Sequence, residues 1–156
     1  MYTSDMILRR YQSSDCQKLI ELFRETVHTI NRNDYTRVQC DAWAPADIDV
    51  GQWDLRLSAH LTLVAVENGT VVGFADMDET GYLDHLYIRA GCQRRGIATA
   101  LCDALESAIR KNVYTTHASI TALPFFEDRG YTVVKEQHVE RCGIVLKNFL
   151  MEKRAP

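Results

Sequence analysis

The segment Gln93-Arg94-Arg95-Gly96-Ile97-Ala98 stands between a predicted strand over residues 82–88 and a predicted helix that begins at Ile97. Small residues at such a junction let the backbone approach a ligand closely. The free amides and partial positive charge of a helix's first turn favour phosphate oxygens, and Arg94 and Arg95 add charge. The segment therefore predicts a phosphate-binding turn. The alternative is a plain turn glycine with two exposed arginines.

The residues before this turn predict a strand, a long helix and a less regular stretch. Met6 to Tyr11 form the predicted first strand, and Ser14 with Gln17 predicts a capping box at the start of the helix. Residues 31–60 contain a proline between two tryptophans and predict one or two short helices joined by loops. The apolar stripe of the long helix recurs every three or four residues and consists of Cys16, Leu19, Ile20, Phe23, Val27 and Ile30.

A hairpin is predicted immediately upstream of the strand over residues 82–88. Residues 61–66 and 71–77 are rich in strand-forming side chains, and they flank Asn68-Gly69. That dipeptide readily supplies the positive φ angles of a two-residue hairpin turn. The chain therefore enters the phosphate-binding turn from a sheet of antiparallel strands.

The residues after the turn predict a second helix and three more strands. The helix extends from Ile97 to about Asn112, a strand covers residues 116–120, and a short helix covers 123–129. Two closing strands are predicted at 131–136 and 143–151. The order β-α-α-β-β-β-α-β-α-β-β predicts an α/β (α+β) fold, a mixed sheet with helices on both faces.

Length and composition exclude several classes of protein. The chain has 156 residues, 46% of them hydrophobic, which fits one globular domain over residues 1–156. The net charge of −3 gives no general reason to bind nucleic acid or an anionic membrane. The apolar runs are far shorter than the ~20 residues that span a bilayer, and charged residues interrupt the N-terminus. We expect a soluble cytoplasmic protein.

The cysteines and histidines do not form a metal-binding pattern. The five cysteines are scattered without a C-x-x-C pair, and the five histidines are equally dispersed. We therefore expect neither a structural zinc nor a disulfide framework. Cys92 and Cys102 flank the phosphate-binding turn and suggest a covalent route through a cysteine nucleophile, but small buried hydrophobic roles are more typical of such residues.

The phosphate-binding segment matches neither G-x-x-x-x-G-K-[ST] nor G-x-G-x-x-G, so a nucleotide or dinucleotide is not indicated. It does match Q/R-x-x-G-x-G/A after a strand, and the chain thereby resembles the GNAT acetyltransferase superfamily over nearly its whole length. Residues 122–131 are similar to a second segment of that family, A-x-x-F-Y-E-x-x-G-F. Tyr35, Gln39 and Trp43-Ala-Pro45, with the closing segment 143–151, resemble the YafP-like branch.

The resemblance implies a mostly antiparallel sheet of about seven strands that splays between the fourth and fifth. The pantetheine arm of acetyl-CoA would lie in that gap, and the amides around Gly96 would hold its pyrophosphate. Phe125 and Phe126 would flank the arm near its sulfur. The implied cofactor-binding residues are Leu86, Tyr87, Ile88, Gln93, Arg94, Arg95, Gly96, Ile97, Ala98, Thr99, Ser119, Pro124, Phe125 and Phe126.

Acetyl transfer to an ammonium group needs a base, and the fourth strand offers two candidates. Strand alternation places Asp84 on the face that carries Tyr82 and Leu86, where some relatives have a catalytic histidine. Asp84 is thus the first candidate, with an arginine pair or a loop contact as the alternative role. His85 titrates nearer neutrality but is predicted on the opposite face, unless a β-bulge rotates it back.

One residue departs from the family pattern. Phe126 stands where many members have a tyrosine that protonates the leaving thiolate, and a phenyl ring cannot donate that proton. Tyr131 and Tyr114 are the candidate substitutes, with packing as the alternative for each. The loss is tolerable because a thiol with a pKa near 8.5 yields a fair leaving group without protonation.

The family places acceptor contacts on the first helices and the closing strands. Two tryptophans in the irregular stretch predict an aromatic wall for a planar or apolar acceptor, or else anchors of the core. The candidate acceptor-binding residues are His28, Tyr35, Gln39, Trp43 and Trp53.

Three functions fit this sequence. The first is an acetyl-CoA-dependent N-acetyltransferase, a monomer or homodimer without metal, that acts on a small-molecule amine or related nucleophile by direct transfer in a ternary complex. The second is a non-catalytic acetyl-CoA-binding regulatory module, suggested by the missing tyrosine. The third is an acetyltransferase for a protein amine.

Overall fold

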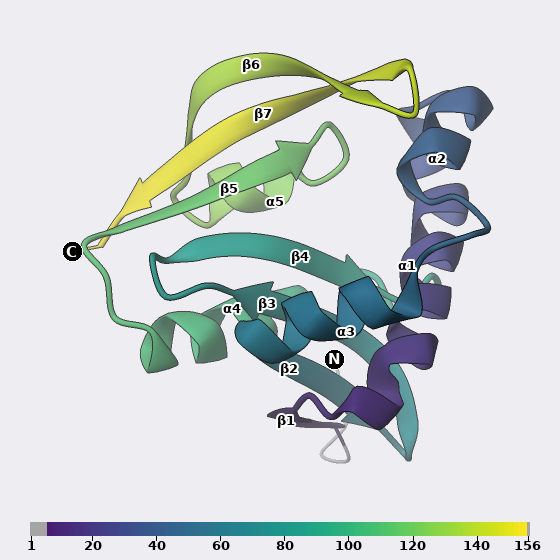
Figure 1. The fold of residues 1–156 in the computed structure, drawn as a ribbon. Helices are drawn as coiled ribbons and strands as arrows, with labels where there is room; N and C mark the ends of the chain where they lie inside the picture. Colours follow the sequence, from purple (N-terminus) through teal and green to yellow (C-terminus); the bar gives the residue numbers. More distant parts are fainter. Residues whose placement is uncertain (1–5, 156) are drawn as a thin grey trace.

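The computed structural model describes residues 6–155, which form one seven-stranded sheet in the order β1-β2-β3-β4-β5-β7-β6 (Figure 1). All neighbouring pairs are antiparallel except β4 and β5, which are parallel. The predicted mixed sheet of about seven strands is confirmed. The strands are β1 (Met6–Arg10), β2 (Leu61–Glu67), β3 (Thr70–Met77), β4 (Tyr82–Ile88), β5 (Val113–Ser119), β6 (Thr132–Arg141) and β7 (Ile144–Arg154).

Helices cover both faces of the sheet, as predicted. One face packs against the first three helices, and their shared core includes Phe23, Leu57 and Phe74. The other face packs against the last two, and that core includes Leu83 and Leu101. The helices are α1 (Cys16–Thr29), α2 (Arg37–Trp43), α3 (Val50–Ala59), α4 (Ile97–Ala108) and α5 (Leu123–Asp128), with 3-10 turns at Ser13–Asp15 and Asn31–Asn33.

The predicted hairpin is present between β2 and β3. Asn68 and Gly69 have φ angles of 51° and 79°, the positive values that a two-residue turn of this type requires. The stripe of α1 is also buried as predicted, with Leu19 and Val27 fully inaccessible. Residues 31–60 contain two short α-helices, α2 and α3, in agreement with the expected short helices.

Two local predictions are wrong. The capping box of Ser14 and Gln17 does not form, because α1 begins at Cys16 and Ser14 lies in the preceding 3-10 turn. There the carboxylate of Asp15 accepts the main-chain N–H of Gln12 at 2.8 Å and pairs with Arg9, which fixes the turn instead.

The second predicted helix is shorter than expected. α4 ends at Ala108 rather than near Asn112, and β5 begins at Val113 rather than residue 116. The Tyr114 hydroxyl donates to the Ile109 carbonyl at 2.7 Å and accepts the N–H of Lys111. These contacts hold the chain in a tight connection that leaves no room for another helical turn.

The sheet opens between its two parallel strands. β4 and β5 pair only at Tyr82 with Thr115 and at Leu83 with Thr116. The Thr116 hydroxyl reinforces this end by donating to the Leu83 carbonyl at 2.9 Å. In Figure 1 the two strands start side by side and then diverge, so the last residues of β4 have no neighbour from β5.

Candidate active site

A β-bulge in β4 places two predicted catalytic residues together. In the pairing of β3 with β4, Asp76 lies opposite His85 and Met77 opposite Leu83, so Asp84 is an extra residue. The extra residue breaks the alternation of side chains. Asp84 and His85 therefore lie close together, with His85 Nδ1 3.6 Å from Asp84 Oδ2. The predicted opposite placement of these residues is wrong, and the bulge is the reason.

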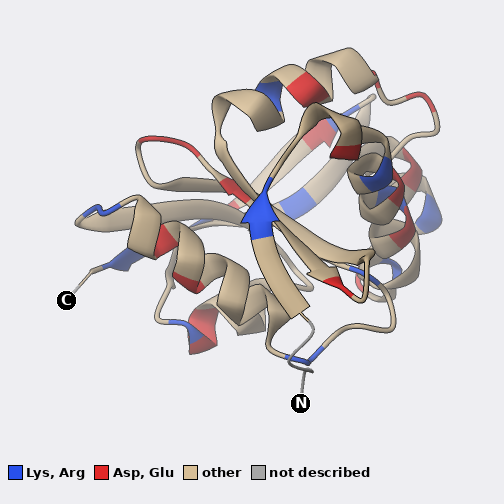
Figure 2. Cartoon of the chain, turned by 90° about the horizontal axis from the view of Figure 1, so that it is seen from below, with Lys and Arg blue, Asp and Glu red and all other residues tan. Residues whose placement is uncertain are grey.

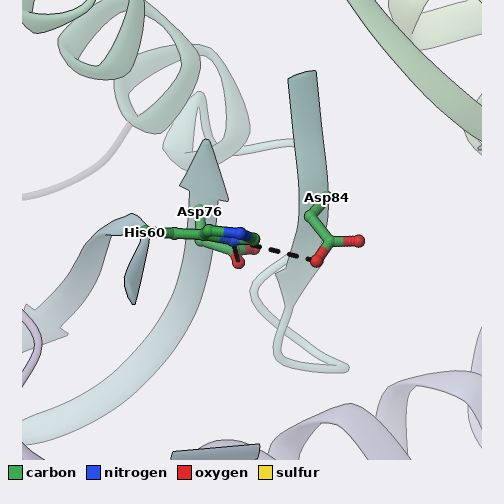
Figure 3. Close-up of side chains that lie close together, drawn as sticks. All are labelled: His60, Asp76 and Asp84. Atoms are coloured by element: carbon green, nitrogen blue, oxygen red, sulfur yellow. Dashed lines mark hydrogen bonds and ion pairs between the residues drawn. The ribbon is translucent and has the colours of Figure 1, made fainter. Parts of the chain in front are cut away.

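A buried carboxylate on β3 holds two histidines. Asp76 is fully inaccessible, and its Oδ1 accepts both the main-chain N–H of His85 at 2.8 Å and His85 Nδ1 at 2.9 Å. Its Oδ2 contacts Nδ1 of His60, the residue that follows α3, at 2.8 Å. Figure 3 shows His60, Asp76 and Asp84 converging from three different elements. An ionised carboxylate can only accept hydrogen bonds, so both histidines donate Nδ1–H to Asp76, and in the neutral rings Nε2 is the basic nitrogen.

Asp84 is paired with an arginine of α3. Arg56 Nε lies 2.6 Å from Asp84 Oδ2, in an ion pair without an aligned hydrogen bond. The Asp84 side chain is 8% exposed, whereas that of Arg56 is 59% exposed. In Figure 3 the second oxygen of Asp84 points away from His60 and Asp76. That oxygen can accept a hydrogen bond from a bound substrate.

The cluster raises the basicity of its histidines. Burial opposes protonation of His85, but the hydrogen bond to Asp76 and the charges of Asp76 and Asp84 outweigh it and raise the pKa of His85. The hydrogen bond to Asp76 raises the pKa of His60 as well. Burial works against the charge of Asp76, yet its bonds to both histidines keep its pKa below the ordinary value. When the histidines are neutral, the charges of Asp76, Asp84 and Arg56 give the cluster a net charge of −1. One added proton therefore neutralises it.

Two cavities meet at this cluster. The first, about 710 Å³, lies among α1, α2, α3 and the β6–β7 ribbon, and the second, about 830 Å³, follows the gap between β4 and β5. Such volumes are typical of small-molecule sites. The residues that line both cavities are Trp43, Asp84, His85, Tyr87, His117 and Ser119.

The far end of the second cavity is the predicted phosphate-binding turn. Gly96 is the N-cap residue of α4 with a φ angle of 80°, and it provides no side chain to cap the helix. The first main-chain bond of the helix runs from Ala100 to Gly96, so the amides of residues 97–99 precede it. Arg94 also has a positive φ, 62°, which turns the backbone toward the cavity wall. Uncapped amides at a helix start are suited to phosphate oxygens.

All of the predicted cofactor-binding residues except Arg95 line the second cavity. Arg95 instead pairs with Glu67 at the end of β2, so its guanidinium is directed away from the gap. Gln93 lines the cavity, and its side-chain amide donates to the Ile88 carbonyl at 2.6 Å. Of the two arginines, Arg94 alone belongs to the wall of the cavity.

The open edge of β4 presents main-chain groups to the gap. Arg89 N–H donates to the Val72 carbonyl, so Arg89 and Tyr87 direct their main-chain groups toward β3. Alternation then directs those of Leu86 and Ile88 toward the gap. The Ile88 carbonyl accepts the Thr26 hydroxyl at 3.0 Å, which leaves the groups of Leu86 facing the cavity.

The structure does not bring the predicted tyrosine donors to the site. Tyr131 is 2% exposed, packs against Phe126 with ring centroids 5.1 Å apart, and lines neither cavity. Burial raises its pKa, which suits packing rather than proton donation. Tyr114 holds the connection between α4 and β5. Cys102 is 1% exposed, and burial raises the pKa of its thiol to about 12, so it is no nucleophile.

The predicted acceptor-binding residues divide into two groups. Trp43 and Trp53 line the first cavity, as does Tyr35, whose hydroxyl joins the Lys147 carbonyl at 2.5 Å to the N–H of Ile120. His28 and Gln39 do not line it. His28 Nε2 contacts the Ala44 carbonyl at 2.9 Å, and the Gln39 side chain caps α2 and donates to the carbonyl of Val145. Both therefore serve the fold.

Several site residues were missed by the sequence analysis. Asp76 and His60 lie in different elements and carry no motif, and Arg56 is one of many charged residues on a helix. His117 Nδ1 contacts the Tyr82 hydroxyl at 2.8 Å on the wall of the first cavity. The only available signal was the alternation within β5, which places His117 and Ser119 on one face.

Figure 2 shows basic and acidic residues interspersed over the strands and helices in that view, rather than separated by sign. Across residues 6–155, none of the helices has both the length and the apolar character of a membrane span.

Comparison with known proteins identifies the family. A family model described as an acetyltransferase (GNAT) domain matches residues 31–153. The uncharacterised N-acetyltransferase YafP of Escherichia coli (strain K12) is 38% identical over 144 residues, which make up 92% of this chain and 93% of YafP.

Solved structures agree with this match. A GCN5-related N-acetyltransferase from Rhodopseudomonas palustris is 34% identical, with a TM-score of 0.93 over 99% of both chains. The PaiA N-acetyltransferase of Thermoplasma acidophilum, solved in complex with coenzyme A, is 18% identical with a TM-score of 0.78, covering 96% of this chain and 99% of that chain. YncA of Salmonella typhimurium, solved with its cofactor acetyl-CoA, is 20% identical with a TM-score of 0.71 over 98% of both chains.

Proposed function

The chain belongs to the GNAT acetyltransferases, in the branch that contains YafP, and from this premise we propose that it transfers the acetyl group of acetyl-CoA directly to the amine of a small molecule. The observation that carries the proposal is the shared wall of the two cavities. A donor in the second cavity and an acceptor in the first would meet at Asp84 and His85. Both substrates then react in one ternary complex, without a covalent enzyme intermediate.

The second cavity fits acetyl-CoA along its length. The uncapped start of α4 at Gly96 suits the pyrophosphate, and Arg94 adds a positive charge. The edge of β4 at Leu86 offers main-chain groups to the pantetheine amides, with Phe125 on the cavity wall as an apolar neighbour of the arm. A thioester bound there supplies the activated acetyl group.

We propose His85 as the base. An alkylammonium with a lysine-like pKa near 10.4 must lose a proton, at a cost of about 4 kcal/mol at neutral pH. His85 Nε2 is the free nitrogen of a ring whose Nδ1–H is held by Asp76, and the cluster raises its pKa toward that of the amine. The free oxygen of Asp84 accepts a second N–H of the amine and orients its lone pair.

The proposal also covers the leaving thiolate. Phe126 offers no proton, and Tyr131 lies outside both cavities. His117 lines both, and its Nδ1 contacts Tyr82, so its Nε2 is a candidate to deliver a proton to the sulfur. A thiol with a pKa near 8.5 makes this step helpful rather than essential.

The proposal is tested by CoA release in the presence of acetyl-CoA and panels of small amines, with mass spectrometry of the products. We expect acetylated product for at least one amine. The variant His85→Gln should reduce kcat by roughly 10²- to 10⁴-fold, the usual contribution of a positioned base. The variant Leu55→Ala, on a 74% exposed residue of α3 outside both cavities, is the matched control and should behave as the wild type.

Two outcomes would contradict the proposal. Tight CoA binding without turnover across the panels would favour the non-catalytic module. Acetylation of a protein in a host extract, with all small amines inert, would favour the protein-directed enzyme. If His85→Gln keeps full activity, the transfer depends on positioning rather than on this base.

A further inference from the structure

The first cavity presents a positive and a negative group side by side at the place where the acceptor amine must lie. From this arrangement we infer that the acceptor is an α-amino acid with an aromatic or large apolar side chain. The inference rests on the proposed acetyl transfer and narrows its substrate class.

Arg56 is placed to bind a carboxylate. It lines the first cavity, its side chain is 59% exposed, and only its Nε is engaged, by Asp84 Oδ2 at 2.6 Å. Within residues 6–155 no hydrogen bond occupies its two terminal nitrogens. A guanidinium binds a carboxylate best through two parallel N–H···O hydrogen bonds. The terminal nitrogens of Arg56 can donate such a pair to the carboxylate of a bound acceptor.

Asp84 and His85 are placed to bind the amine next to it. The free oxygen of Asp84 accepts one N–H, and His85 Nε2 accepts another. Because Arg56 contacts Asp84 directly, the cation and the anion of the site are immediate neighbours. An α-amino acid carries its ammonium and carboxylate groups on the same carbon, so it matches this close spacing, whereas an amine with a distant acid does not.

Aromatic rings form the wall beyond these charges. Trp53 lies 5.0 Å from both Phe23 and His85 between ring centroids, and Tyr87 lies 4.9 Å from Phe23 and 6.5 Å from Trp43. All five line the first cavity. A side chain that extends from the α-carbon into this wall gains contact with apolar and π surfaces, which favours aromatic and large aliphatic amino acids.

The other charges of the cavity argue against a polyamine acceptor. Its two lining carboxylates are both engaged, Asp84 with Arg56 and Asp49 with the N–H of Gln52 at the start of α3. The remaining charged residues on its wall, Arg141 and Lys147, are basic. With neutral histidines the charged side chains of this wall sum to +1, which disfavours a second ammonium group.

The test compares L-phenylalanine with two analogues that lack its carboxylate and with a polyamine. Steady-state CoA release is measured with L-phenylalanine, L-phenylalaninamide, phenethylamine and spermidine at saturating acetyl-CoA. For the wild type we expect kcat/KM for L-phenylalanine to exceed that for the amide and for phenethylamine by about ten- to a hundredfold, the usual effect of one charge-assisted pair. Spermidine should be the poorest acceptor.

The variant Arg56→Gln separates recognition from chemistry. Loss of the Asp84 partner alters the rate with every acceptor, so the readout is the ratio of kcat/KM for L-phenylalanine to that for phenethylamine. This ratio should fall to near one in Arg56→Gln and be partly retained in Arg56→Lys, which keeps the charge without the fork. Arg10→Gln, which removes the same charge outside both cavities, should leave the ratio unchanged.

The outcomes distinguish the two claims. Equal or better turnover of phenethylamine or spermidine, or an unchanged ratio in Arg56→Gln, overturns the amino-acid inference and leaves acetyl transfer intact. The absence of CoA release with these four acceptors overturns the amino-acid inference, whereas inertness across the full amine panels would contradict the proposed function as well.

Discussion

Asp76 is the residue on which the protonation of both histidines depends. It is fully buried, and each of its oxygens contacts a different imidazole, that of His85 or that of His60. Burial of a charge without partners is costly, so the carboxylate and the two rings are interdependent. Asp76 does not line either cavity, so in the proposed mechanism its role is to position His85 rather than to contact a substrate.

The variant Asp76→Asn tests this role. The amide oxygen can still accept from His85, while its NH₂ group forces His60 into its other tautomer, so the shape of the cluster is kept but its charge is lost. The raised pKa of His85 should fall. We expect the acid limb of the kcat/KM profile to move to lower pH, as measured with one acceptor between pH 5 and 9. If the variant is folded and the acid limb of its kcat/KM profile stays at the same pH, Asp76 does not set the pKa of His85.

Arg94 and Arg95 are adjacent and chemically identical, yet the structure separates them. Arg94 lines the second cavity, whereas Arg95 pairs with Glu67. Arg94→Ala should therefore weaken CoA binding by about tenfold, with a reduced dependence on salt, since one charge-assisted contact is lost. Arg95→Ala is the control and should retain affinity. Calorimetry at two salt concentrations measures both, and equal losses would contradict the assignment.

At the scale of elements, the start of α4 and the bulge of β4 define the two ends of the site. The helix start provides amides because its N-cap is a glycine without a capping side chain. The bulge exists because Asp84 lies between Leu83 and His85 in β4, whereas their partners in β3, Met77 and Asp76, are consecutive. One feature is set by local backbone conformation and the other by the pairing of two strands.

The helix start can be tested with two matched glycines. Gly96 and Gly69 have φ angles of 80° and 79°, so an alanine is strained by a similar amount, about 1 to 2 kcal/mol, at either position. Gly69 is in the β2–β3 hairpin, where a Cβ would meet nothing within 4 Å. Both variants should lose stability in urea, but only Gly96→Ala should lose affinity for CoA, by about tenfold or more. Equal affinities would show that the Gly96 turn does not bind the phosphates.

At the scale of the whole molecule, the cluster links three elements that are distant in sequence. Arg56 comes from α3, and His60 directly follows that helix. Asp76 comes from β3, and β4 supplies both Asp84 and His85. Protonation of this cluster is therefore expected to affect the stability of the entire fold.

Stability should accordingly depend on pH in a defined direction. The histidines have folded pKa values above their ordinary 6.5, so their contribution is complete below 6.5 and is lost as the pH rises through the raised values. Asp76 has a pKa below its ordinary 3.8, so its contribution is present above 3.8 and is lost as the pH falls through the lowered value. Each unit of pKa shift corresponds to about 1.4 kcal/mol.

Urea unfolding at pH 5.5 and pH 8.5 measures this dependence. In the wild type, the contribution of the cluster to the free energy of unfolding should be larger at pH 5.5 than at pH 8.5. Asp76→Asn should lose about 1 to 3 kcal/mol overall and show a smaller difference between the two pH values. The same difference in wild type and variant would mean that other groups control the pH dependence.

The amino-acid sequence by itself determined most of the elements and the glycine turn that begins α4. The Asn68-Gly69 hairpin, the stripe of α1 and the helix start at Gly96 follow from backbone preferences and periodicity within a few residues. These are local properties, so the order of the elements along the chain and the family resemblance could be predicted from the sequence alone.

Only the tertiary structure decided which side chains meet. Alternation along β4 predicted Asp84 and His85 on opposite faces, but a bulge is fixed by the register with β3, which no single strand encodes. Asp76 and His60 became visible only once packing buried the carboxylate between strands and helix. The pKa of an ionisable group depends on the burial, charges and hydrogen bonds that the fold provides, so the properties of this site could not be predicted from the sequence.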